Sequence, residues 1–112
     1  MIKGIRSYLV LIGAILSMAS LGSGAALAAD CKVLHDAIHK ERVLMKKKAL
    51  VEAALKVCPK DPDIVYENGY IFERFRKYEE ALFNYRKAIA LDAGYAKAYF
   101  SIGDIEALQN NY

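Results

Sequence analysis

Three side chains that can bind transition metals recur at every fourth position near residue 31. Cys31, His35 and His39 have this spacing, with Asp36 beside them. On a helix they share one face, because residues i and i+4 are neighbours. A thiolate and two imidazoles are ligands that zinc accepts, but the pattern matches neither H-E-x-x-H nor C-x-x-C-H. A metal-dependent function is therefore one hypothesis. We prefer the alternative, in which the histidines lie at the surface or pack in the core, and expect no metal.

Cys31 has a competing use, because Cys58 is the only other cysteine in the chain. We expect helices over 31–43 and 47–57, and in a helical hairpin the start of the first lies beside the end of the second. A disulfide is therefore geometrically sensible and would contribute roughly 3 to 4 kcal/mol in the chain-entropy model. The alternative is two separate thiols, one buried and one free. We expect the disulfide, which would leave no thiolate for a metal.

Other catalytic patterns are missing from the sequence. It has no glycine-rich phosphate loop, no nucleophile elbow, and no carboxylate pair whose spacing demands acid–base chemistry. The acidic pair Glu79 and Glu80 is explained by a helix N-terminus, where the helix dipole favours negative charge. We therefore expect no catalytic residues, no cofactor and no enzymatic activity.

The first residues are typical of an export signal. Lys3 and Arg6 precede an uncharged, largely apolar run over 7–29, and Ala26-Leu27-Ala28 supplies a small-x-small cleavage site. This pattern predicts a signal peptide over residues 1–28 and a periplasmic or secreted mature protein. It also places both cysteines in a compartment where disulfides persist.

The alternative is an uncleaved anchor in the inner membrane. Residues 8–29 are just long enough to span a bilayer, and the basic residues before them would keep the amino end inside. Gly22, Ser23 and Gly24 interrupt the apolar run, which favours cleavage. With an anchor, the protein would be a membrane-anchored assembly factor of the cell envelope.

Charge argues against a nucleic-acid partner. The chain of 112 residues has 16 basic and 13 acidic residues. Without Lys3 and Arg6 the two signs nearly balance, whereas nucleic-acid binders carry clustered excess cation. The one basic run, Lys46 to Lys48, is interpreted as a solvated loop or helix end. With 55% hydrophobic residues, the chain fits one ordinary globular domain after the signal.

Apolar residues after the signal follow a helical period. Between Glu79 and Leu91 they form one stripe of an amphipathic helix, and no segment is typical of a strand. Asp61 is a good N-cap with Pro62 at the first helical position, and Gly94 is a plausible helix stop. We expect an all-α protein with five helices, over 31–43, 47–57, 62–74, 79–91 and 95–109.

The sequence also repeats itself with a shift of about 34 residues. The shift aligns Gly69 with Gly103 and Ile71 with Ile105. It also pairs Tyr66 with Phe100, Ala54 with Ala88, Leu55 with Ile89 and Tyr78 with Tyr112. This period is typical of a helix-turn-helix repeat, in which each helix pair buries one face against the next.

These residues resemble the tetratricopeptide repeat (TPR) family, with the match centred on residues 63–92. The matching positions are Gly69, Phe72, Tyr78, Ala81, Tyr85 and Ala88. The chain departs from the family pattern at Asn68, Arg76, Ala93 and Glu106. The resemblance implies a right-handed superhelical stack of antiparallel helix pairs with about two and a half repeats. These would be a degenerate unit over 29–61, a repeat over 62–95, and the first helix of a truncated repeat over 96–112.

The resemblance also implies a concave groove that binds a partner protein or peptide. Carried over residue by residue, the groove face would hold Asp63, Tyr66, Tyr70, Glu73, Arg74, Lys97, Phe100, Asp104 and Leu108. The first unit would add Lys32, Asp36, His39 and Lys40. The alternative for Tyr66 and Phe100 is a place in the core between repeats. A clamp for a partner's C-terminal carboxylate is not expected, because Asp36, Glu67 and Ser101 stand where Asn or Arg is needed.

The last expected helix is too apolar for a finishing cap, which should have a polar outer face. Its apolar residues include Tyr99, Phe100, Ile102, Ile105 and Leu108. We therefore expect the chain to be the amino-terminal repeat region of a larger protein. The leading hypothesis for function is a non-enzymatic protein-binding scaffold of the cell envelope.

Overall fold

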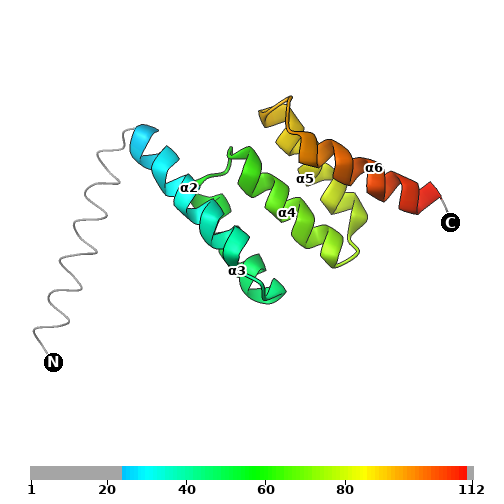
Figure 1. Cartoon of the computed structure of the whole chain (residues 1–112), viewed down its shortest axis with the longest axis horizontal. Helices are drawn as coiled ribbons and strands as arrows, with labels where there is room; N and C mark the ends of the chain where they lie inside the picture. The colour runs from blue at the N-terminus through cyan, green and yellow to red at the C-terminus, as the bar shows by residue number, and fades with distance from the viewer. Residues whose placement is uncertain (1–23, 111–112) are drawn as a thin grey trace, which may run out of the picture. The chain divides into compact units, whose positions relative to one another are not determined.

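A computed structural model describes residues 24–110, and this part of the chain consists of helices without strands (Figure 1). The all-α fold expected from the sequence is confirmed. The chain divides into two compact units, Met1–Asp30 and Cys31–Tyr112, and most of the first lies outside the described residues. The helices are α2 (Gly24–Lys40), α3 (Leu44–Val57), α4 (Pro62–Arg74), α5 (Tyr78–Leu91) and α6 (Ala96–Asn110).

The predicted signal peptide, residues 1–28, falls mainly outside the described part. Only residues 24–28 are described, and they form the first turns of α2. In residues 24–110, no helix has the length and apolar character needed to cross a membrane.

The helix boundaries agree best with the sequence where a capping residue is present. α4 has the expected bounds because the Asp61 carboxylate accepts hydrogen bonds from the backbone N–H of Asp63 and Ile64, at 2.9 and 3.3 Å. α3 begins three residues earlier than expected, and its first turns include the run Lys46 to Lys48. This run is part of a helix, where Lys48 forms an ion pair with Glu52 one turn later.

The end of α5 differs from the expected glycine stop. Gly94 lies in the turn after α5, but it has no positive φ and therefore does not act as a left-handed C-cap. Its N–H instead donates to the Asp92 carboxylate at 3.0 Å. In the described residues the left-handed conformation is adopted by Arg76, with φ of 60°. Arg76 stands where the TPR pattern has its turn glycine, so this turn carries a backbone cost of about 1 kcal/mol.

α4 and α5 pack closely at Gly69. A Cβ built on Gly69 would lie 2.7 Å from two ring carbons of Tyr85 and 3.3 Å from the carbonyl oxygen of Ala81. Only a residue without a side chain permits this approach. The Tyr85 ring fills the space over Gly69 and is completely buried.

Two apolar clusters share α4. One contains Val65 of α4 together with Tyr85 and Ala88 of α5 and Ala98 and Ile105 of α6. The other joins α2, α3 and α4 through Ile38, Val51, Ala54, Cys58, Ile64 and Ile71. α4 is therefore the central helix of a stack in which each helix pair covers the next, as expected from the fold class.

A hydrogen-bonded polar pair joins α4 and α5. The side-chain amide of Asn68 donates to Oδ1 of Asn84 at 2.9 Å, and the Asn84 amide donates to the Glu80 carbonyl at 2.8 Å. Asn84 is almost fully buried. The departure of Asn68 from the TPR pattern is therefore accompanied by a hydrogen-bonding partner on the facing helix, which satisfies both amides.

The first helical hairpin is joined at its open end by a disulfide. The sulfurs of Cys31 and Cys58 are bonded, and the two Cα atoms lie 5.9 Å apart. Cys58 is buried within the α2–α4 cluster and Cys31 packs at its edge. The bridge therefore holds the start of the hairpin against the end of α3.

The contact at Gly69 generates a prediction with an internal control. Gly69→Ala should destabilise the fold by about 1 to 3 kcal/mol, because the added methyl overlaps the Tyr85 ring. Gly103→Ala, at the equivalent position of α6, meets nothing within 4 Å and should stabilise by up to about 1 kcal/mol through helix propensity. Urea unfolding followed by circular dichroism measures both. Equal effects at the two positions would contradict the packing described.

The disulfide generates a second prediction. Replacing both Cys31 and Cys58 by Ser should lower the free energy of unfolding by roughly 3 to 4 kcal/mol, because the unfolded chain regains the entropy of the open loop. The measurement is urea unfolding with and without reductant, and reductant should have no effect on the double variant. Two alkylatable thiols in native, oxidised protein would show that the bridge is not formed.

Candidate functional site

A row of tyrosines connects α5, α4 and the start of α6. The ring of Tyr66 lies 5.3 Å from that of Tyr85 and 5.5 Å from that of Tyr95, measured between centroids, and both pairs are tilted. The Tyr95 hydroxyl donates to Oδ1 of Asp63 at 2.7 Å. The Tyr66 hydroxyl lies 3.3 Å from the Ser101 hydroxyl. These contacts hold α6 against α4. Side chains of both helices therefore face one common surface.

One pocket on this surface, which we call the aromatic pocket, has a volume of about 290 Å³. It contains two tyrosines of α4, three side chains that carry or can carry positive charge, and one buried carboxylate. Lys47 lies over the ring of Tyr70, with Nζ 5.3 Å from the centroid, a cation–π contact. The lining residues are His39, Lys47, Tyr66, Glu67, Tyr70 and Lys97.

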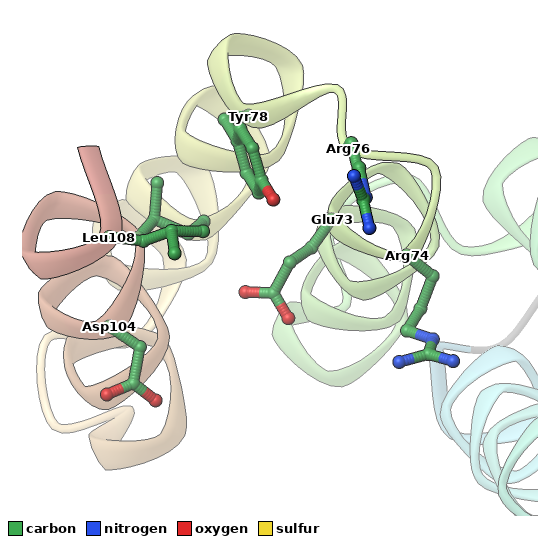
Figure 2. Close-up of a pocket in the computed structure, with 7 residues that line it drawn as sticks. Glu73, Arg74, Arg76, Tyr78, Asp104 and Leu108 are labelled. Carbon is green, nitrogen blue, oxygen red and sulfur yellow. The ribbon is translucent and has the colours of Figure 1, made fainter. Parts of the chain in front are cut away.

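A second pocket, which we call the carboxylate pocket, has a volume of about 340 Å³. Its lining side chains come from α4, the α4–α5 turn, the start of α5 and the second half of α6 (Figure 2). Glu73 projects from α4 into the space between α4 and α6, and Asp104 borders the same space from α6. The lining residues are Glu73, Arg74, Arg76, Tyr78, Asp104, Ile105 and Leu108.

The electrostatics of the carboxylate pocket disfavour negative charge on Glu73. Its partial burial raises the pKa of the Glu73 carboxyl above its usual value, and the Asp104 carboxylate raises this pKa further. Tyr85 and Arg74 act in the opposite direction. Burial is also the largest cause of the raised pKa of Tyr66, Tyr85 and Tyr95, so these hydroxyls remain protonated at neutral pH.

Most of the residues predicted for the groove line these two pockets. Tyr66, Tyr70 and Lys97 line the aromatic pocket, while Glu73, Arg74, Asp104 and Leu108 line the carboxylate pocket. Their role in binding remains a prediction.

Two predicted groove residues are placed differently. Asp63 is engaged by the Tyr95 hydroxyl. Phe100 is 76% exposed and lines neither pocket, so it is not part of the inter-repeat core.

Fewer residues of the first unit line the two pockets than the sequence predicted for the groove. His39 lines the aromatic pocket, but Lys40 lines neither pocket, and Lys32 forms an exposed ion pair with Asp36 one turn away. Instead, Lys47 of α3 completes the aromatic pocket. Lys47 already lay in the helix expected over 47–57, but no residue of that helix was predicted for the groove.

Several other lining residues were not predicted for the groove. Glu67 was considered only as a mismatch to a carboxylate clamp, yet its side chain is buried beside two groove tyrosines. Arg76, Tyr78 and Ile105 were singled out in the sequence only as a departure from the TPR pattern, a match to it and an apolar repeat position. The sequence signal at Arg76 is its place at the turn glycine of the TPR pattern, where the structure shows a positive φ, but this signal does not indicate a pocket residue.

The metal hypothesis at Cys31, His35 and His39 is wrong for this structure. The sulfur of Cys31 is bonded to Cys58 and therefore cannot act as a thiolate ligand. The imidazole rings of His35 and His39 are stacked, with centroids 6.1 Å apart. Across residues 24–110, no group of three or more His, Cys, Asp or Glu side chains could hold a metal ion.

Comparison with known proteins identifies a distant relative. Over 88 residues, 74% of this chain, the sequence is 31% identical to Protein O-mannosyl-transferase TMTC1 of Mus musculus. The chain spans only 9% of the length of the mouse protein. No protein-family model matches the chain, and no solved structure matches it.

The raised pKa of Glu73 generates a prediction for stability. Because the pKa of Glu73 is higher in the folded state than in the unfolded state, the folded state loses stability as the pH rises through this raised pKa. Glu73→Gln should therefore raise Tm at pH 7 by about 1 to 3 °C, since water partly screens this carboxylate. At a pH below the usual pKa of a glutamate side chain, the wild type and the Glu73→Gln variant should have the same Tm.

Glu106→Gln provides the matched control, because Glu106 lies on the exposed side of α6 and lines neither pocket. Thermal unfolding from pH 3 to pH 8 measures all three proteins. A Glu73→Gln variant less stable than the wild type at pH 7 would contradict the electrostatic description.

Proposed function

We propose that this protein is a non-enzymatic interaction module that binds a partner protein or peptide along α4 and α6. The aromatic and carboxylate pockets together form the binding groove. One observation carries the proposal: seven of the nine predicted groove residues line these two pockets. Tyrosine, arginine and lysine side chains that present both apolar surface and charge are suited to peptide recognition.

The repeat unit proposed for this module is the tetratricopeptide repeat. Three of the residue pairs related by the shift of about 34 residues, Ala54 with Ala88, Leu55 with Ile89 and Ile71 with Ile105, have matching burial, which supports the assignment, whereas Gly69 with Gly103 and Tyr66 with Phe100 differ. Ala54 and Ala88 are both fully buried, and Ile71 and Ile105 are nearly so. Gly69 provides the close approach between helices that the resemblance requires.

We propose that the module acts outside the cytoplasm, in the periplasm or as a secreted protein. The signal-like sequence over residues 1–28 and the bonded cysteine pair support this location, because structural disulfides persist in oxidising compartments. The remaining alternatives are a module anchored to the inner membrane and the amino-terminal repeat region of a larger protein. The mass of the mature protein distinguishes cleavage from anchoring.

The name of the mouse relative refers to mannosyl transfer. This chain spans 9% of that protein, and the geometry described supports binding. We therefore propose a binding function for this chain and do not extend the transferase activity of the mouse protein to it.

The experiment selects phage-displayed random peptides of about twelve residues on the oxidised full chain and measures their affinity by fluorescence anisotropy. The double variant Tyr70→Ala, Lys97→Glu should bind the selected peptides at least about tenfold more weakly, because it removes an aromatic wall and reverses a charge in the groove.

Its matched control is Phe83→Ala, Lys87→Glu. This variant also removes one aromatic side chain and reverses one lysine, but on a separate surface of α4 and α5, and it should bind normally. Circular dichroism must show that both variants are folded at the assay temperature. Equal losses in the two folded variants, or no loss in the groove variant, would refute the groove assignment.

A further inference from the structure

The carboxylate pocket brings together two acidic side chains from different helices without a counter-ion. In residues 24–110, the side-chain ion pairs are Lys32 with Asp36 and Lys48 with Glu52. Neither Glu73 nor Asp104 takes part in one. The negative charge of Asp104 raises the pKa of Glu73, so the two carboxylates repel each other across the pocket. A bound cation would remove this repulsion.

The arginines that line the pocket form no ion pair with Glu73 or Asp104, although Arg74 acts to lower the pKa of Glu73. Figure 2 shows Arg74 on the side of α4 that faces away from α6 and Asp104. Arg76 projects from the α4–α5 turn, and neither arginine comes within ion-pair distance of Glu73 or Asp104. The space between the two carboxylates is therefore open to a cation supplied by another molecule.

A second observation is the hydroxyl of Tyr85. The side chain is fully buried, and its hydroxyl has no hydrogen-bond partner. This hydroxyl lies near the Glu73 carboxylate and the Ser101 hydroxyl, close enough to influence the pKa values of Glu73 and Tyr85. A buried polar atom without a partner is unusual in a folded protein, and this one lies beside Glu73, one member of the acidic pair.

The remaining walls suit a long side chain with a charged end. Tyr78, Ile105 and Leu108 provide aromatic and aliphatic lining, and Figure 2 shows Leu108 across the space from Glu73. Lysine and arginine bury their hydrocarbon stems on such surface while the charged group reaches polar partners. A volume of about 340 Å³ lies at the small end of the range for ligand pockets, which suits one side chain better than a whole ligand.

From these features we propose that the carboxylate pocket receives a lysine or arginine side chain of the bound partner, held between Glu73 and Asp104. This proposal rests on the partner-binding function proposed above. It specifies which kind of partner side chain the pocket binds, because an acidic or purely apolar side chain would leave the two carboxylates unpaired in the complex.

The neighbouring aromatic pocket extends the charge pattern. Lys47 and Lys97 line it together with the Glu67 carboxylate, and Arg74 and Arg76 line the carboxylate pocket together with the acidic pair, so each pocket presents both signs of charge. A partner segment of mixed charge complements this arrangement, with its basic side chain between Glu73 and Asp104 and an acidic side chain near Lys47 and Lys97. Complementary charges also fix the direction in which the segment binds.

The test uses the selected peptides as probes, each synthesised in two forms. In one form the basic residue is retained, and in the other it is replaced by norleucine, which keeps the aliphatic stem and removes the charge. For the wild-type chain, norleucine should weaken binding at least about tenfold, since a hydrogen-bonded charge is lost. For the folded double variant Glu73→Gln, Asp104→Asn, the two peptide forms should bind with nearly equal affinity.

Glu106→Gln is the matched control and should retain the full preference for the basic peptide. The inference is overturned if norleucine has no effect on the wild type, or if its effect is equally large in the double variant. In either case the binding function stands as long as the groove variant Tyr70→Ala, Lys97→Glu still loses affinity. If that variant binds normally, or if no peptide is selected, both proposals fail.

Discussion

The packing of the Tyr85 ring over Gly69 is the contact on which the rest of the structure depends. A glycine at this position lets α5 approach α4 so closely that even a methyl group would overlap the ring. The ring is the largest fully buried side chain in the described part of the chain. Because α4 also takes part in the cluster with α2 and α3, its alignment with α5 sets the geometry of the whole stack.

The candidate site follows from the same contact. Tyr85 supports the ring of Tyr66, which in turn packs against Tyr95 at the start of α6, so α6 is held by aromatic contacts and by Ala98 and Ile105. Glu73 and Asp104 consequently border one space, and the Tyr85 hydroxyl lies beside Glu73 on the core side. The arrangement leaves a buried hydroxyl without a partner and a repulsive carboxylate pair, and a basic side chain would relieve the repulsion.

The sequence was sufficient for features that depend on local chemistry or on the repeat. The Asp61 cap with Pro62 determined the start of α4, and the resemblance to the TPR family marked Gly69, where the structure has its close helix contact. Features that arise from tertiary packing were missed. The recruitment of Lys47 to the aromatic pocket and the burial of Glu67 depend on how neighbouring helices meet. The matched amides of Asn68 and Asn84 lie sixteen residues apart, and only the packed helices bring them together.

The central claim is that the surface of α4 and α6, with its two pockets, is the binding surface of this protein. Nuclear magnetic resonance of the oxidised, isotope-labelled chain, titrated with a selected peptide, tests it most directly. The account predicts that the largest chemical-shift changes occur at groove residues such as Tyr70, Lys97 and Asp104, with little change at Phe83 and Asn84. Shifts concentrated around Phe83 and Asn84, with the groove residues unchanged, would contradict it.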